Sequence, residues 1–431
     1  MLFRSRKIWG DRGVTPGRML SVPLLVGMGI SCAWARQAQP APQSLTLAAA
    51  IDLAEKQNLD LAAARAQRAV AEAGIRTAGE RPNPTLSAGA SRDAPHENVL
   101  IDQPLEIGPK RERRIEVARQ EAAVTESDIA ALTKQVRHNV RDAYFALART
   151  RAATAQQGDI LKLADRLLEI AKSRFDAGDI PMLEVTQSEL ESARARADQQ
   201  VAQQEEKVAL SEFNALLNEP ASTDWDLGDP FAVLPSLPTL AELVGRAQGS
   251  NSEIAKTDRE VRLEQSRQAL LKAERIPNLG LQIGADLNNP GPPGAVATGG
   301  YEVGARGQLS MELPIFSRNQ GEIAQSIANT HALEGALAAA RRAVDAKVES
   351  AYLELEARQT QAQLYRETIL PSSRKLEEMS EESYRAGKAS ILTVLSAQRD
   401  VQQGERDYLD SLLAVESAFS ELEEAVGSPL D

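Results

Sequence analysis

The chain has 431 residues, of which 26% are charged and only 4% aromatic, and its formal net charge is −12. Few aromatics, together with stretches rich in Ala, Leu, Glu, Gln and Arg, favour long helices with narrow apolar stripes over a compact aromatic core. An acidic chain repels phosphates, so we expect no nucleic-acid partner.

The N-terminal segment, residues 1–35, predicts a signal peptide that is cleaved on export. Five basic residues flank its start, an apolar run extends from Met19 to Ile30, and the small-x-small sequence 33–35 follows. The apolar run is short for a membrane-spanning helix, although a retained anchor is the alternative. Met19 is also an alternative start to Met1.

The only cysteine, Cys32, lies in this segment. A mature chain cut after residue 35 would have no cysteine and a net charge of −16, which excludes disulfides and cysteine-based sites. A lipid anchor on Cys32 is the alternative, but the preceding residues 29–31 lack the usual leading Leu of a lipoprotein box. No later stretch is apolar for long enough to form a transmembrane helix, so a membrane protein of this sequence would have to be a β-barrel.

Two copies of one unit follow the signal segment. The matches run in order along both halves, and the insertions between them fall in loops, as a duplicated structural unit predicts. They pair Thr46-Leu47 and Asn58 with Thr239-Leu240 and Asn251, PNPTLSAG (82–89) with PNLGLQIG (277–284), AYFAL (143–147) with AYLEL (351–355), and FDAGDIPMLEV (175–185) with YRAGKASILTV (384–394).

Each copy predicts a helix, a β-hairpin, a very long helix, a turn and a third helix. We place the copies at 36–219 and 239–428, with a proline-rich linker at 220–238 beside the middle of the helices. The expected elements are 47–80, 84–91, 99–107, 110–175 and a helix to 218, and then 239–275, 278–288, 300–313, 319–383 and 389–426. The two shorter helices of a copy together match the long one, so we expect them to stack end to end beside it.

The strands alternate between apolar and polar residues, which is typical of a transmembrane barrel with lipid outside and water inside. The polar face of the last strand carries Glu302, Arg306, Gln308 and Glu312, which we assign to the barrel lumen. Four strands per chain would leave open edges, so several copies must close one ring. A soluble two-layer sheet is the alternative reading of the strands alone.

The segments PLEIGPKRERRIEVARQEA (104–122) and LPIFSRNQGEIAQ (313–325) follow the two hairpins. With them the chain resembles the TolC-like outer-membrane efflux channels, and 104–122 resembles the heavy-metal (CzcC/CusC-like) branch. The resemblance implies a mainly α fold with a membrane β-barrel portion, in which a homotrimer forms a twelve-stranded barrel in outer-membrane lipid that continues as an α-helical barrel into the periplasm.

The resemblance also implies roles for the two helix turns, where a periplasmic adaptor (membrane fusion protein) would bind and link the channel to an inner-membrane RND pump. The adaptor-contacting residues would be Ala177, Gly178, Asp179, Ala386 and Gly387.

The periplasmic gate of the family falls on Glu184, Tyr384 and Lys388 of this sequence. Lys388 stands where the best-known channel has Arg, so a bidentate link is lost. The family's acidic rings at the turns fall on Thr393 and Ser396, so we do not expect a cation-binding ring there.

No catalytic set, cofactor site or metal site is predicted, because the three histidines (His96, His138 and His331) are scattered. We expect a passive exit duct of a tripartite RND-type efflux system, exporting heavy-metal cations. The alternatives are a multidrug or type I secretion duct of the same fold and, in another class, a soluble periplasmic coiled-coil scaffold or adaptor.

Overall fold

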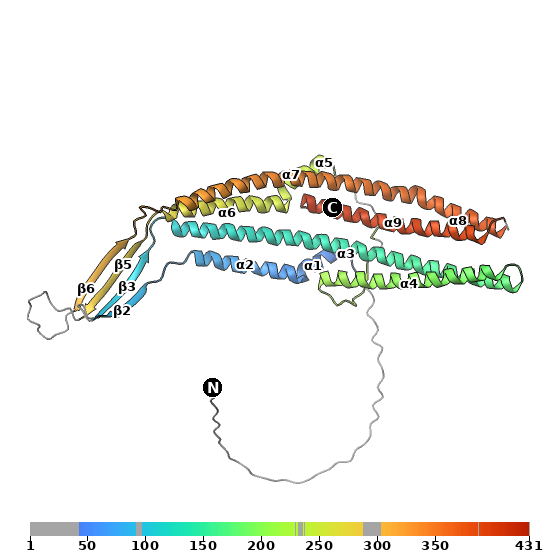
Figure 1. The fold of residues 1–431 in the computed structure, drawn as a ribbon, viewed down its shortest axis with the longest axis horizontal. Coiled ribbons are helices and arrows are strands. Elements are labelled where there is room, and N and C mark those ends of the chain that lie inside the picture. The colour runs from blue at the N-terminus through green and yellow to red at the C-terminus, as the bar shows by residue number, and fades with distance from the viewer. Residues whose placement is uncertain are drawn as a thin grey trace, which may run out of the picture. The chain divides into compact units, whose positions relative to one another are not determined.

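A four-stranded sheet lies at one end of two sets of long helices in the computed structural model of the protein (Figure 1). The structure describes residues 43–91, 97–228, 230–231, 236, 238–287, 303–386 and 388–430. The expected signal peptide with Cys32, as well as His96, Glu302 and Gly387, lies outside these ranges. No described helix has both the length and the hydropathy needed to cross a membrane.

The elements come in the same order in both halves of the chain. The first half has α1 (Leu47–Gln57), α2 (Leu59–Ala78), β2 (Thr85–Ala90), β3 (Glu97–Leu105), α3 (Lys110–Asp176) and α4 (Met182–Leu217). The second has α5 (Leu240–Ser250), α6 (Ser252–Glu274), β5 (Leu279–Leu287), β6 (Val303–Met311), α7 (Gln320–Leu364), a π-helical turn η1 (Tyr365–Ile369), α8 (Leu370–Arg385) and α9 (Ile391–Val426). Two short strands, β1 (Gln43–Ser44) and β4 (Trp225–Asp226), pair beside the helices. The strands of the main sheet lie within a few residues of the expected limits.

The helices pack side by side in the same order as the strands to which they connect. The sheet order is β2-β3-β5-β6, and next to it α2 packs on α3, α3 on α6, and α6 on α7 (Figure 1). Farther from the sheet, α4 packs on α3, α3 on α9, and α9 on α7 and α8. Within the described chain, α2 and α4 thus form one flank and α7 and α8 form the other.

Asn58 and Asn251 divide the helices that we predicted as continuous over 47–80 and 239–275, so that expectation was wrong in detail. Both residues have an extended backbone, with ψ of 125° and 133°. Each side-chain oxygen accepts hydrogen bonds from backbone N–H groups of the next turn, one at Asn58 and two at Asn251. These bonds satisfy donors that a new helix start would otherwise leave open, which stabilises the break.

The same two asparagines connect the stacked helices. The Asn58 amide donates to Leu216 O of α4 at 3.3 Å, and the Asn251 amide donates to Ala425 O of α9 at 2.8 Å. In each copy, the end of the last helix therefore meets the break between the first two. The expected stacking of the shorter helices beside the long one is present in both copies.

The long helix of the second copy contains a π-helical turn, where we predicted one regular helix over 319–383. Between AYLEL (351–355) and Ala386, this copy has one residue more than the first copy has between AYFAL (143–147) and Ala177. A π-helical turn is the form that a single inserted residue usually takes within an α-helix. The turn η1 lies in this interval and accounts for the extra residue.

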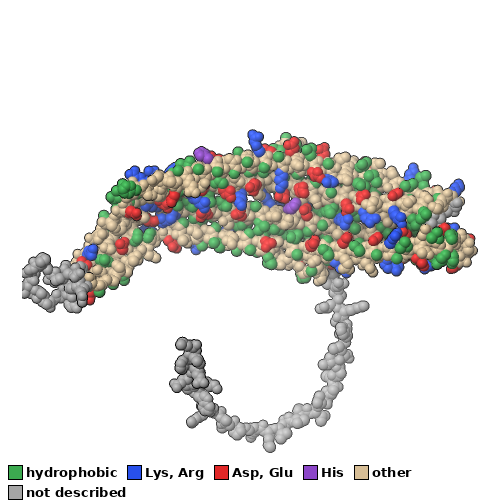
Figure 2. Space-filling model, in the orientation of Figure 1, with side chains coloured by type: hydrophobic (Ala, Val, Ile, Leu, Met, Phe, Trp, Pro, Cys, Tyr) green, Lys and Arg blue, Asp and Glu red, His purple; other side chains and the backbone are tan. Residues whose placement is uncertain are grey.

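Each copy has its own buried core at the middle of the helices. Members of the first are Ala50, Val136, Val140, Tyr144, Leu147, Phe213, Leu217 and Trp225. Members of the second are Leu243, Ala247, Val348, Leu355, Val415, Phe419 and Leu422. Charged side chains of both signs are scattered among hydrophobic and other side chains over the visible surface of the helices (Figure 2).

Arg141 of α3 joins the first copy to α9 of the second. Its side chain is 8% exposed and its guanidinium carbon lies 4.4 Å from the centroid of the Phe419 ring. It pairs with Glu423 at 2.8 Å and with Glu416 at 3.5 Å. A buried charge is tolerated only when it is paired in this way, so the contact fixes α9 against α3.

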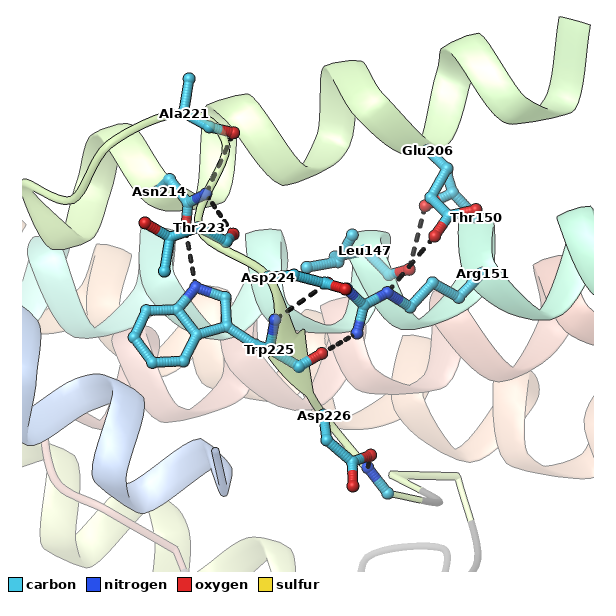
Figure 3. Close-up of polar contacts among 11 residues, drawn as sticks. Leu147, Thr150, Arg151, Glu206, Asn214, Ala221, Thr223, Asp224, Trp225 and Asp226 are labelled. Atoms are coloured by element: carbon cyan, nitrogen blue, oxygen red, sulfur yellow. Dashed lines mark hydrogen bonds and ion pairs between the residues drawn. The ribbon is translucent and has the colours of Figure 1, made fainter. Parts of the chain in front are cut away.

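The segment after α4 is fastened by polar contacts (Figure 3). Trp225 Nε1 donates to Asn214 Oδ1 at 2.7 Å, and the Asn214 amide donates to Thr223 O at 2.8 Å. Arg151 of α3 donates to Trp225 O and forms ion pairs with Asp224 and Glu206. The start of the predicted linker is therefore held against α3 and α4.

Replacing Asn251 with Ala should lower the free energy of unfolding by about 1–2 kcal/mol, because it removes a helix cap and the donor to Ala425. The matched variant Asn58→Ala should lose less, since its cap bonds one N–H instead of two and its link to α4 is longer. Thermal unfolding in detergent, followed by far-UV circular dichroism, measures both. If Asn251→Ala unfolds at the wild-type temperature, the hydrogen bonds of the Asn251 side chain contribute nothing to stability.

Candidate functional site: the sheet faces and the helix turns

The register of the sheet separates its side chains into two faces. Thr85 pairs with Asp102, Asp102 with Gln282, and Gln282 with Gln308, which places one polar row across all four strands. Side chains alternate along a strand, so the neighbouring positions form the opposite face. That face carries Leu86, Ala88, Val99, Ile101, Leu281, Ile283, Ala285, Ala305 and Leu309.

The apolar face has no cover from the rest of the described chain. Among the described elements, the strands of this sheet pack on one another and no helix packs extensively on them. Ile283 is 58% exposed and Leu309 is 66% exposed, although a soluble sheet would bury such positions. The soluble two-layer alternative therefore lacks its second layer.

The polar face contains two of the four residues that we assigned to a lumen. Arg306 and Gln308 lie on it, and Arg306 Nη1 is 3.9 Å from Asp286 Oδ1 of the adjacent strand. Glu312 follows the last residue of β6 and is exposed. Glu302 lies outside the described residues.

Polar contacts fix the junction between the sheet and the helices. Lys110, at the start of α3, is buried and its ammonium donates to Asn278 Oδ1 at 2.5 Å, which joins the first copy to the second. Arg114 pairs with Glu106, and this hydrogen bond lowers the pKa of the Glu106 carboxyl. Gly108 has φ +82° and a side chain there would meet Ile276, so only glycine fits.

The first helix turn is closed by backbone hydrogen bonds. Asp179 N donates to Arg174 O at 2.9 Å, and Gly178 has φ +78° with open space where a side chain would be. Glu184 lies in the first turn of α4 and is half-buried. Phe175, Met182 and Leu183 are exposed around the turn, although apolar side chains usually avoid water.

The second helix turn differs in its charge. Ala386 follows α8, and Lys388 N donates to Ser383 O at 2.8 Å. Tyr384 is the penultimate residue of α8. Among the described residues no ion pair joins Glu184 to Lys388, so within one chain the structure does not bring the predicted gate acid and base together.

Carboxylates gather where α8 packs on α9. Burial raises the pKa of Glu377, and the nearby Glu381 and Glu405 act in the same direction. Arg374 opposes them and pairs with Glu405 at 2.9 Å.

His138 is a contact residue between α3 and α9. Its Nδ1 lies 2.6 Å from Ser420 Oγ. In the part of the chain that the structure describes, no group of three or more His, Cys, Asp or Glu residues is placed to hold a metal ion. Sequence reasoning missed Arg141, because nothing in a run of charged helical residues marks the one that is buried.

Comparison with known proteins gives a family match over most of the chain. The model of the outer membrane efflux protein family matches residues 50–219 and 243–428. The cobalt-zinc-cadmium resistance protein CzcC of Cupriavidus metallidurans is 24% identical over 386 residues, with 89% of this chain and 90% of the relative covered. The nickel-cobalt-cadmium resistance protein NccC of Alcaligenes xylosoxydans is 26% identical, with 83% and 80% covered. The pyoverdine export outer membrane protein OpmQ of Pseudomonas aeruginosa is 23% identical, with 87% and 82% covered.

Solved structures share the fold. The structure of CusC has a TM-score of 0.72 at 17% identity, with 91% of this chain and 96% of that chain covered. The outer membrane protein VceC of Vibrio cholerae has a TM-score of 0.71 at 16% identity, with 89% and 97% covered.

The family match defines what the protein is. Its two matched segments, 50–219 and 243–428, lie within the two copies described above. The chain therefore belongs to the outer membrane efflux protein family and is an outer-membrane channel that extends into the periplasm.

Proposed function

We propose that three copies of the chain form the exit duct of a tripartite efflux system for heavy-metal cations. The observation that carries this proposal is the sheet, which has one bare apolar face, one polar face and two open edges. In a membrane the apolar face would contact lipid and the polar face would line a wet lumen. Backbone groups at an open edge cannot be left unpaired in hydrocarbon, so β6 of one copy must pair with β2 of the next.

The flanks of the helices support the same ring. Leu59, Val70, Val201 and Val208 are exposed on α2 and α4, and Leu353, Leu364, Leu376 and Met379 are exposed on α7 and α8. Two apolar flanks on opposite sides of one chain fit a head-to-tail assembly that closes by rotation. Three copies would supply twelve strands, which is the number that the resemblance implies.

The helix turns would form the periplasmic end of the duct. Exposed Phe175, Met182 and Leu183 at the first turn, with Leu392 at the second, offer an apolar surface to a helical adaptor. Ala177, Gly178, Asp179, Ala386 and Gly387 would contact that adaptor, which would in turn hold the inner-membrane RND pump. Glu184, Tyr384 and Lys388 would form the resting gate, with the acid and the base contributed across the ring or on closure.

Heavy-metal cations are the proposed cargo. The relatives CzcC and NccC are named for resistance to cobalt, cadmium, zinc or nickel, and each covers four-fifths or more of both chains. OpmQ, which is named for pyoverdine export, favours a small organic cargo as the second candidate. The duct uses no energy of its own in either case.

The lipid-facing assignment predicts opposite outcomes for neighbouring residues of β5. Ile283→Arg should reduce the amount of protein in the outer membrane severalfold, because Arg at mid-membrane costs about 2–4 kcal/mol. The matched variant Gln282→Arg points into the lumen and should insert normally. Immunoblots of membrane fractions measure both, and equal insertion would contradict the assignment of the two faces.

The cargo is tested by growth of a deletion strain. We expect loss of the protein to sensitise cells to cobalt, zinc or cadmium salts, with restoration by the wild-type chain and not by Ile283→Arg. Lipophilic drugs and siderophore secretion are measured alongside. A defect confined to drugs or siderophores would assign the duct to organic cargo instead.

The gate is tested in planar bilayers. Tyr384→Phe together with Lys388→Ser should raise single-channel conductance, because it removes a charge-assisted contact that opening must break. The control is Lys375→Ser, because Lys375 is exposed and lies on α8, the helix that also contains Tyr384. This variant should leave conductance unchanged. Wild-type conductance in the double variant would mean that these residues do not hold the channel closed.

A further inference from the structure

The two copies of the unit make it possible to derive contacts between chains from contacts within one chain. Inside the chain, the hairpin and long helix of copy one pack on copy two. In the proposed ring, copy two of one chain would pack in the same way on copy one of the next. We infer that each contact between the copies recurs at the chain boundary, between the matching residues, and this inference rests on the proposed ring.

The register of the strands defines this boundary residue by residue. The match of Pro82-Asn83 with Pro277-Asn278 aligns β2 with β5, and the pairing within each hairpin then aligns Asp102 with Ser310. The same alignment places AYFAL on AYLEL in the helix that follows, so two independent matches agree. Asp102 pairs with Gln282 inside the chain, and the equivalent residues are Ser310 and Ser87.

β6 therefore pairs antiparallel with β2 of the next copy, with Ser310 opposite Ser87. This register puts Met311 opposite Leu86 and Leu309 opposite Ala88, so apolar meets apolar on the outer face. Gln308 falls opposite Gly89 on the polar face. A register displaced by one residue would place the apolar side chains of one strand beside the polar side chains of the next. The alignment did not use the two faces, so their agreement supports the register independently.

The sheet–helix junction gives a second contact. The buried Lys110, which donates to Asn278, corresponds to Arg318, and Asn278 corresponds to Asn83. Arg318 and Asn83 are both exposed in the single chain. At the boundary, the Arg318 guanidinium would therefore meet the Asn83 amide oxygen of the next copy, a bond of the same kind as the one inside the chain.

The neighbouring pair at this junction changes its chemistry. Gly108 and Ile276, which touch inside the chain, correspond to Phe316 and Arg81. Phe316 is 92% exposed, and a guanidinium over an aromatic ring is a favourable contact. Hydrophobic side chains gather at this end of the helices in Figure 2, beside basic ones. The boundary thus gives Phe316 a partner that the single chain does not provide.

The helices give a third contact, with reversed charge. Helices α4 and α9 both have 36 residues and align end to end, so Glu416 corresponds to Lys207, while Arg141 corresponds to Glu349. The buried Arg141–Glu416 pair would thus recur as Glu349 with Lys207 of the next copy. The acid and the base have already exchanged positions in one ion pair within each copy. The pair Arg374–Glu405 of the second copy corresponds to Asp165–Arg196 of the first.

Disulfide cross-linking tests the register. Residues directly opposite on antiparallel strands lie about 4.5–5.5 Å apart at Cα, within the reach of a disulfide. Within one chain, Ser87 and Ser310 are three strand spacings apart across the sheet, about 14 Å, and are also displaced by four residues along the strands. They can therefore bond only between chains. Ser87→Cys with Ser310→Cys should give covalent dimers and trimers on denaturing gels after oxidation, which reductant removes.

Three controls accompany this pair. Asp102→Cys with Gln282→Cys is the equivalent pair inside the chain and should oxidise without forming dimers, which proves that the oxidant reaches the sheet. Ser87→Cys with Arg306→Cys is displaced by about 13 Å along the strand and should not cross-link. The single-cysteine variants reveal any bond to Cys32.

Two results would overturn the inference and are distinguishable from failure of the proposed function. Monomers from the Ser87/Ser310 pair, while the control pair oxidises and native gels show a trimer, would reject this boundary and leave the ring intact. Cross-linking of the displaced pair would reject the register in the same way. Monomers on native gels of the wild type would reject the ring itself.

Charge exchange tests the helical contact independently of cysteine chemistry. Glu349→Lys and Lys207→Glu should each lower the temperature at which the trimer dissociates, and the two together should restore it. Absence of restoration in the double variant would remove this contact from the boundary.

Discussion

A strand inside a membrane must pair every backbone N–H and C=O group, because hydrocarbon offers them no other partner. This constraint determines how the strands, and with them the helices, have to be arranged. The chain has only four strands in its main sheet, so β2 and β6 each have one edge that nothing in the described chain covers. The pairing that they need has to come from other copies. The order of the helices follows the order of the strands, so closure of the sheet would bring the helical flanks together as well.

In the helical part, polar contacts position the helices in addition to the two apolar cores. Arg141 lies between the two copies with its charge paired and its guanidinium against Phe419. Asn58 and Asn251 place the ends of stacked helices, and Arg151 and Trp225 hold the segment that leaves the first copy. Such contacts have strict geometry, whereas apolar contacts tolerate sliding. Long helices that touch along narrow stripes need this kind of positional control.

The sequence alone was sufficient for the features that have a period or a repeat. Alternation along 279–287 predicted the apolar and polar faces, and the duplicated motifs predicted the order of the elements. It was insufficient for residues whose backbone conformation or burial differs from what the surrounding helical pattern predicts. Helical periodicity continues through Asn58, so the break depends on hydrogen bonds of its side chain. The side-chain oxygen caps the next helix, and the amide donates to Leu216 O at the folded end of α4. The burial of Arg141 likewise depends on α9, which is far away in the sequence. The gate residues came from a resemblance, and no ion pair joins Glu184 to Lys388 in the part of the chain that the structure describes.

The π-helical turn has a consequence for how the two copies could diverge. One added residue in an α-helix rotates everything beyond it by about 100°, which would swing the apolar stripe of α8 away from α9. A π-helical turn takes up the extra residue in one wide turn, and the helix beyond it resumes its former phase. The last helix of each copy accordingly has the same 36 residues in the same alignment. Helical phase is thus conserved through an insertion, so the length of one arm could change during evolution while its packing stayed in place.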